Sequence, residues 1–168
     1  MLPIQVFSTD GGLTYQAKSL DLSSGAYTLI YDVPVPWTSC YLNSAGISPV
    51  DGKAYATVMN YGVGSYLIRF DETRVEFLAK LYDPSKIYDY DSFTLDFNAG
   101  AMAANGTFYI HSSSRLWSME SVDELTGYSS SSDASIPDWS AMGPTVTSTV
   151  SLGADFVVLD TDEFEGGA

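Results

Sequence analysis

The residues best equipped for chemistry in this chain are carboxylates. Its 168 residues include 21 acidic and 7 basic side chains, which give a formal net charge of −14. Two groups of acids lie close together in the sequence: Asp83, Asp89, Asp91 and Asp96, and then Asp160, Asp162, Glu163 and Glu165. Calcium prefers oxygen ligands from flexible loops, although neither group has EF-hand spacing. The calcium candidates are therefore Asp89, Asp91, Asp160 and Asp162, and solvated acidic loops are the alternative interpretation.

Catalytic patterns are scarce. His111 is the single histidine, so a Ser-His-Asp triad would have to use it. The sequence has no Gly-x-Ser-x-Gly elbow, no P-loop and no His-Glu-x-x-His motif. Two carboxylates could hydrolyse a glycan if they faced each other across a cleft at about 5–10 Å, but nothing selects such a pair. We therefore expect no catalytic residues and no cofactor, with a glycan-active enzyme as the alternative.

Several aromatic residues stand outside the strand patterns and are candidates for binding. Trp37 follows a Pro-Val-Pro segment, and Tyr61 lies in a Gly-rich turn. Tyrosine and tryptophan offer large contact areas at low entropic cost. The candidates on one expected loop face are Trp37, Tyr61, Tyr88, Asp89, Tyr90, Asp91 and His111. For Tyr88 and Tyr90, packing against a neighbouring sheet is the alternative.

A repeated motif indicates which elements must hold these residues. Residues 45–55 read Ala-Gly-x4-Asp-Gly-x2-Tyr, and residues 99–109 read Ala-Gly-x4-Asn-Gly-x2-Tyr. A period of about 54 residues is typical of repeat architectures, β-propeller blades in particular. The Asp-Gly and Asn-Gly pairs predict type I′ hairpin turns, which need positive φ at both central residues. Asn105-Gly106-Thr107 is also a glycosylation sequon, which matters only if the chain is secreted.

The strand pattern around these motifs predicts an all-β fold of antiparallel four-stranded units, either a partial β-propeller of about three blades or a fragment of a larger one. A helical turn is expected only at 121–127, where Ser121 and Glu124 resemble a capping box. The expected strands are 4–8, 15–21 and 27–31; 41–48, 53–59, 65–71 and 74–82; and 93–103, 107–111, 115–120 and a last one near 125–136. The units are 4–36, 41–90 and 93–140 within a single domain 1–168. Residues 146–152 and 155–160 are strand-like and could supply the strand that the first unit lacks, within a terminal segment 146–168.

Three stretches of the second unit resemble the blade repeat of large secreted and cell-surface propeller proteins, such as bacterial surface proteins and mastigoneme-like extracellular proteins. They are residues 43–46, 51–55 and 66–71, and the likeness spans roughly 14–120. The resemblance implies a structural or binding role. The leading expectation is thus a non-catalytic interaction module of an extracellular or surface assembly, binding protein or glycan through one loop face. A lectin-like half-propeller that oligomerises is a further alternative.

Net charge and hydropathy limit the classes of partner that the chain is expected to bind. The acidic balance argues against nucleic acid and against anionic membranes. No apolar run approaches the roughly 20 residues of a membrane span, and residues 1–10 do not resemble a signal peptide. The expected location is extracellular or at the cell surface, as part of a longer chain, or cytoplasmic if the chain is complete. Three blades would leave sheet faces exposed, so we expect protein subunits that complete or cover the propeller edges. Cys40 stands alone and is expected to be a buried small hydrophobe.

Overall fold

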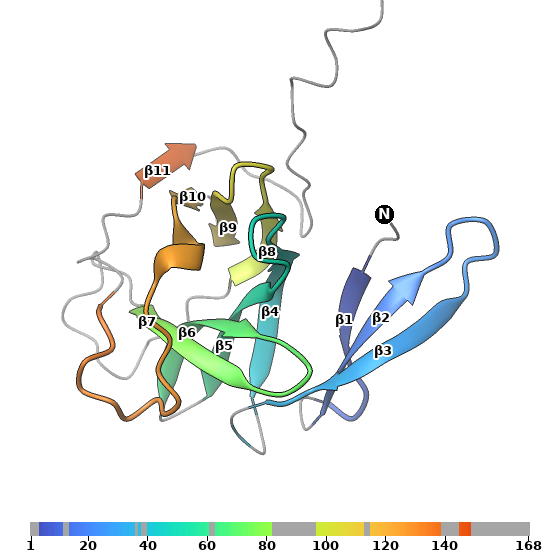
Figure 1. Cartoon of the computed structure of the whole chain (residues 1–168), viewed down its shortest axis with the longest axis horizontal. Helices are drawn as coiled ribbons and strands as arrows, with labels where there is room; N and C mark the ends of the chain where they lie inside the picture. The colour runs from blue at the N-terminus through green and yellow to red at the C-terminus, as the bar shows by residue number, and fades with distance from the viewer. Residues whose placement is uncertain are drawn as a thin grey trace, which may run out of the picture.

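The computed structural model describes residues 4–11, 14–35, 37, 40–60, 63–81, 97–112, 115–138 and 145–148. They form three antiparallel sheets (Figure 1). Sheet A contains β1 (Ile4–Ser8), β2 (Tyr15–Leu20) and β3 (Tyr27–Val33). Sheet B contains β4 (Tyr41–Ile47), β5 (Ala54–Asn60), β6 (Gly64–Phe70) and β7 (Val75–Leu81). Sheet C contains β8 (Phe97–Met102), β9 (Phe108–Ser112), β10 (Arg115–Met119) and β11 (Thr145–Ser148). The all-β prediction is confirmed, and no closed propeller is formed by the described residues.

The last strand of the third unit is not where the sequence pattern put it. Residues 125–136 form no strand; β11 pairs with β10 and completes sheet C instead. The segment after β10 holds a 3-10 turn at Val122–Glu124 and then follows the edge of sheet B, with isolated bridges from Tyr128 to Phe77 and from Asp138 to Lys80. Its serine run lacks the alternation that a half-buried strand needs.

The expected capping box is also absent. Ser121 precedes the 3-10 turn in a left-handed conformation, with φ of 52°, and its side chain makes no capping hydrogen bond.

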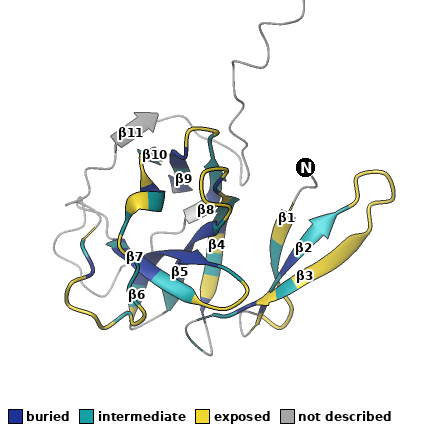
Figure 2. Cartoon of the chain, viewed as in Figure 1, coloured by how far each residue is buried: buried dark blue, intermediate teal, exposed yellow. Residues whose placement is uncertain are grey.

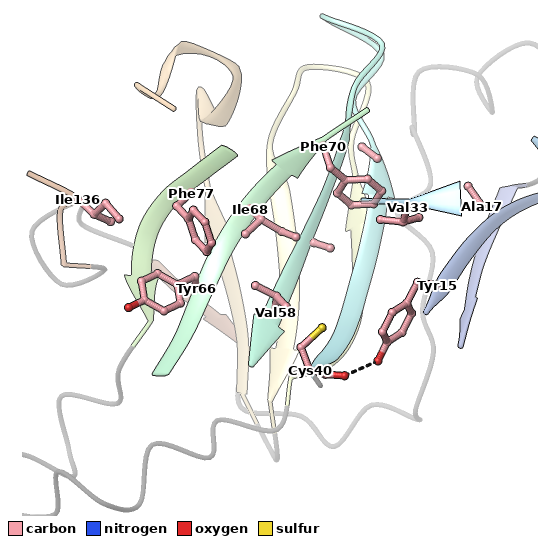
Figure 3. Packing of buried hydrophobic residues seen from close by; sticks show 12 residues of the cluster. Tyr15, Ala17, Val33, Cys40, Val58, Tyr66, Ile68, Phe70, Phe77 and Ile136 are labelled. Carbon is pink, nitrogen blue, oxygen red and sulfur yellow. Dashed lines mark hydrogen bonds between the residues drawn. The ribbon is translucent and has the colours of Figure 1, made fainter. Parts of the chain in front are cut away.

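The three sheets stack face to face, and sheet B is buried on both faces (Figure 2). Between sheets A and B lie Tyr15, Ala17, Val33, Val58, Ile68 and Phe70, shown in Figure 3. Between sheets B and C lie Tyr55, Leu67, Leu78, Phe108, Ile110 and Trp117. Each large apolar side chain buried in these layers contributes about 1.5–3 kcal/mol. The order is therefore A, B, C, with sheet B in the middle.

The repeated Ala-Gly pair marks the place where sheets B and C touch most closely. Gly100 of β8 lies so near β4 that a Cβ built on it would stand 2.3 Å from the carbonyl oxygen of Ser44. A Cβ on Gly46 would meet the backbone nitrogen of Met102 at 3.2 Å. The repeat thus keeps a glycine in the first strands of sheets B and C because the two backbones meet there.

The repeated Asp-Gly and Asn-Gly turns are not type I′, so that prediction is wrong. Gly52 and Gly106 have φ of 72° and 82°, but Asp51 and Asn105 do not have positive φ. Each side chain instead accepts a 3.0 Å hydrogen bond from the backbone N–H of the second residue after it, Lys53 or Thr107. Such an Asx turn leaves only the glycine in the left-handed region. The loops are correspondingly longer, closed by Ser48–Lys53 and Ala103–Thr107 backbone pairs.

Candidate functional site

Of the predicted binding residues, the structure describes Trp37 and His111. The others lie outside the described residues: Tyr61, Tyr88, Asp89, Tyr90 and Asp91, and with them the calcium candidates Asp160 and Asp162. Among the described residues, no group of three or more His, Cys, Asp or Glu side chains could hold a metal ion. The loop face and the calcium sites therefore stay predictions.

Trp37 is anchored against the aromatic side chains of sheet B. It is half-buried, and its ring centroid lies 5.8 Å from that of Tyr66 and 5.6 Å from that of Phe77. Tyr66 and Phe77 themselves meet edge to face at 5.2 Å. Aromatic pairs at such distances add about 0.5–1.5 kcal/mol beyond the area that they bury. The ring is thus held in place by packing, although part of it is still exposed.

A pocket of about 350 Å³ lies beside Trp37. Its lining consists of Pro34, Trp37, Val75, Phe77, Ser129, Ser130 and Ser131. The Tyr66 hydroxyl donates a 3.2 Å hydrogen bond to the carbonyl of Ser131 and so ties the serine loop to β6. Burial raises the pKa of Tyr66, which keeps its phenol neutral. The pocket combines an apolar aromatic wall with a serine wall, within the size range of small-ligand sites, about 300–1,000 Å³.

Sequence reasoning did not find this pocket. Residues 129–133 are a low-complexity segment that indicates an exposed loop, and nothing in their local pattern points to Trp37. The two walls meet only because residues 125–138 follow the edge of sheet B.

His111 lies inside a strand rather than in an exposed loop. It belongs to β9, is 2% exposed, and stands in register between Ala99 of β8 and Leu116 of β10. His111 is therefore not exposed on the predicted loop face. Its position is that of a core residue of sheet C.

A partly buried ion pair ties sheet B to the 3-10 turn. Arg69 donates from Nε to Glu76 Oε2 at 2.8 Å, and its Nη1 donates to the carbonyl of Asp123 at 3.1 Å. Gly127 leaves room for Glu76, because a Cβ there would lie 2.8 Å from the Glu76 side chain. Arg74 adds an outer contact to Glu76 at 3.2 Å. The contacts of Arg69 join β6 to β7 and to the 3-10 turn, so we expect a structural role for this cluster.

Two smaller predictions concern Cys40 and Asn105. Cys40 is buried, as expected, and burial raises the pKa of its thiol to about 11. Its carbonyl accepts a 2.9 Å hydrogen bond from the Tyr15 hydroxyl, drawn in Figure 3. Asn105 is exposed in its turn, and its glycosylation stays a prediction.

The side of sheet A that faces away from sheet B carries exposed apolar side chains next to polar ones. We call this the outer face of sheet A: Gln5, Phe7, Lys18, Tyr27 and Leu29. Tyr27 is 46% exposed and Leu29 is 50% exposed, and Figure 2 shows most of β3 as exposed. These side chains are ordered by their own contacts, because Phe7 meets Tyr27 edge to face at 4.9 Å and the Tyr27 hydroxyl donates to Gln5 at 2.7 Å. The Lys18 ammonium lies 5.7 Å from the Phe7 ring centroid.

Comparisons with known proteins found no relative of this chain. No protein-family model matches the chain, and neither the search of curated proteins nor the search of solved structures found a match. None of the helices in the described part of the chain has the length and apolar character that a membrane span requires. What the chain does is therefore inferred from its own sheets and side chains.

Proposed function

We propose that the chain is a non-catalytic interaction module of an extracellular or surface assembly of β-propeller type, joined to a second copy of itself through the outer face of sheet A. The observation that carries this proposal is the unequal covering of the sheets. Sheet B is covered by sheet A on one side and by sheet C on the other. Sheet A is covered by sheet B on one side, and its other side exposes Tyr27 and Leu29.

A sheet of the same kind is the partner that best fits this face. The chain already packs sheet A on sheet B and sheet B on sheet C, so its sheets have the twist and spacing for such stacking. Propellers carry about four to eight blades, so three sheets leave room for those of a second copy. Tyr27 and Leu29 are already about half covered, so burial of the rest would add about half of the 1.5–3 kcal/mol that full burial of such a side chain contributes. The resemblance of residues 43–46, 51–55 and 66–71 to surface propeller proteins supports an extracellular or surface location for this assembly.

The net charge makes the assembly sensitive to salt. Two copies that each carry a net charge of −14 repel one another, and salt screens that repulsion. We expect analytical ultracentrifugation to show concentration-dependent association that strengthens from low to high sodium chloride. The Leu29→Glu variant should weaken it at least tenfold, because a carboxylate would be buried at the contact.

Val63→Glu is the matched control. Val63 is 48% exposed and lies just before β6 of sheet B, away from sheet A's outer face, so this variant should associate like the wild type. A wild-type chain that stays monomeric at every concentration and salt level would contradict the proposal. So would equal effects of the two variants.

A second candidate function is glycan binding in the pocket beside Trp37. Sugars present apolar ring faces that stack on aromatic side chains and hydroxyls that bond to polar groups, and this pocket offers Trp37 and Phe77 next to the serines at 129–131. Glycan binding here would agree with the lectin-like alternative. If the bound sugar were also cleaved, it would agree with the glycan-active enzyme.

A glycan array followed by isothermal titration calorimetry would test this candidate. The Trp37→Phe variant should bind a glycan hit about tenfold more weakly, because the smaller ring loses stacking area. Trp117→Phe, in the other core layer, should bind like the wild type. Equal affinities for the two variants, or an array without hits, would remove the candidate, and chromatography of the glycan would show any cleavage.

A further inference from the structure

Sheet A has an edge to which no strand of the described residues is paired. In the described part of the chain, sheets B and C have four strands each, and sheet A has three in the order β1-β2-β3. β1 is therefore the edge strand of sheet A, and the strand paired with it among the described residues is β2. Figure 1 shows β1 on the side of sheet A nearest β4. The edge of a sheet offers backbone N–H and carbonyl groups to an added strand.

A cavity of about 270 Å³ lies along this edge. It is lined by Ile4–Phe7 of β1, Leu42–Ala45 of β4, and Ala99 and Gly100 of β8. Successive residues of a strand point to opposite faces of its sheet, so a cavity that meets four consecutive residues of β1 lies at the strand's edge rather than on one face. None of the lining residues is ionisable. An uncharged occupant therefore fits this space, because a charge would lose its hydration without gaining a partner.

The first strands of sheets B and C show how closely backbones can pack beside this cavity. A Cβ on Gly100 of β8 would stand 2.3 Å from the Ser44 carbonyl oxygen of β4, so these strands meet through a glycine. A strand added to β1 would take the place in sheet A that β4 and β8 take in theirs. It would face both of them across the cavity. Small side chains such as alanine and glycine therefore suit it.

One polar group at the cavity has no partner among the described residues. Ser44 lines the cavity and is 3% exposed, and its hydroxyl makes no hydrogen bond within the described part of the chain. Buried polar groups are nearly always hydrogen-bonded, so this hydroxyl favours an occupied cavity. Rotation about the Cα–Cβ bond of Ser44 would let the hydroxyl donate to a backbone carbonyl of an added strand.

We propose that the edge of β1 binds an extended, uncharged segment of a partner protein, which pairs with Ile4–Phe7 as a fourth strand of sheet A. Main-chain hydrogen bonds to β1 would hold the segment, and the cavity beside β4 and β8 would select small side chains. The described strands of a second copy are each joined to a sheet, whereas a cavity of about 270 Å³ has room for part of one strand. The donor is therefore a single segment of another protein. This site lies at the edge of sheet A, so it does not depend on the self-association proposed for the outer face.

Fluorescence anisotropy with a labelled synthetic peptide tests this site in the full chain. The probe has the sequence of residues 97–103, Phe-Asn-Ala-Gly-Ala-Met-Ala, which is the first strand of sheet C with its Ala-Gly pair. We expect saturable binding. Two further probes carry N-methyl groups at alternate residues, one set in each probe. One of the two should bind at least tenfold more weakly than the other, because it lacks the N–H groups that face β1.

Two pairs of variants locate the binding site. Ile4 lines the cavity and is 40% exposed, so Ile4→Glu should weaken peptide binding at least tenfold without unfolding the chain. Val50→Glu, in the turn after β4, should bind like the wild type. Ser44→Ala should weaken binding about fivefold and leave the urea midpoint unchanged or higher, because the lost hydroxyl had no partner among the described residues. Ser48→Ala should lower the midpoint and leave binding unchanged, because the Ser48 hydroxyl accepts a 3.2 Å hydrogen bond from the Val50 N–H.

Hydrogen exchange followed by mass spectrometry shows where the peptide binds. Saturating peptide should slow exchange in Ile4–Phe7 about tenfold and leave exchange in Phe108–Ser112 of β9 unchanged. Absence of saturable binding, equal binding of the two methylated probes, or equal affinities within either pair of variants would overturn the proposal. Faster exchange in Phe108–Ser112 would also overturn it, because the peptide would then have replaced β8. So would protection of Ile4–Phe7 in the free chain that grows with protein concentration, because a second copy would then occupy the edge.

Discussion

Gly100→Ala is expected to destabilise the chain by about 3 kcal/mol or more, near the upper end of what overpacking costs. The added Cβ would lie 2.3 Å from the Ser44 carbonyl oxygen and 2.7 Å from the carbonyl carbon. Both are backbone atoms, so no side chain can turn away to relieve the clash. Strands β4 and β8 would have to separate, and the layer between sheets B and C would loosen with them. Urea denaturation followed by tryptophan fluorescence measures the loss.

Gly46→Ala is the matched control because it sits on the facing strand of the same contact. Its Cβ would meet the Met102 nitrogen at 3.2 Å, which a shift of a few tenths of an ångström relieves. We expect a cost of about 1 kcal/mol. A Gly100→Ala variant as stable as the wild type, or less affected than Gly46→Ala, would mean that the two strands do not meet as described.

Arg69→Met should also cost about 3 kcal/mol, because it leaves the Glu76 carboxylate without its closest partner in a poorly hydrated site. The Arg69 and Glu76 side chains are 11% and 16% exposed, and their closest atoms are 2.7 Å apart. The substitution also removes the hydrogen bond to Asp123, so the 3-10 turn should loosen from sheet B. Thermal and urea unfolding would give the change in the free energy of unfolding.

Arg74 provides the comparison because it contacts the same carboxylate from the solvent side. Its side chain is 59% exposed, so Arg74→Met should cost at most about 1 kcal/mol. Replacing both partners, as Arg69→Met with Glu76→Leu, should recover most of the stability lost by Arg69→Met, because no charge is then left unpaired. Equal losses of stability in Arg69→Met and Arg74→Met would show that the partly buried Arg69–Glu76 contact stabilises the chain no more than the exposed Arg74–Glu76 contact.

The sequence pattern predicts most strands of sheets A and B because their apolar residues and turn signals are local. The run 64–70 can be recognised without its neighbours, and Gly52 marks the preceding turn correctly. Turn type was missed because Asp51 offers a side-chain oxygen that satisfies the backbone in another geometry. Local patterns also cannot show that residues 125–138 run along sheet B rather than form a strand of sheet C, since that choice depends on contacts with Phe77 and Lys80.

The candidate site is harder to predict from the sequence because it too depends on contacts between residues far apart in the chain. An aromatic residue after a proline-rich segment suggests an exposed binder, yet Trp37 packs on Tyr66 and Phe77, which follow much later in the chain. His111 is polar and precedes a serine run, which suggests a loop, whereas pairing on both sides places it within sheet C. Burial of a polar or aromatic side chain is decided by tertiary neighbours that no local pattern contains.

The segment that follows the edge of β7 has a consequence for aggregation. Phe77 exchanges backbone hydrogen bonds with Tyr128 at 2.8 and 2.9 Å, and the Lys80 N–H donates to the Pro137 carbonyl at 2.9 Å. These are the groups that an exposed edge strand would offer to an incoming strand of another molecule. With them occupied by the chain itself, the apolar strands β5 to β7 are poor templates for amyloid-like growth from that edge. The backbone contacts of Tyr128 and Pro137 therefore protect this edge of sheet B against fibre formation.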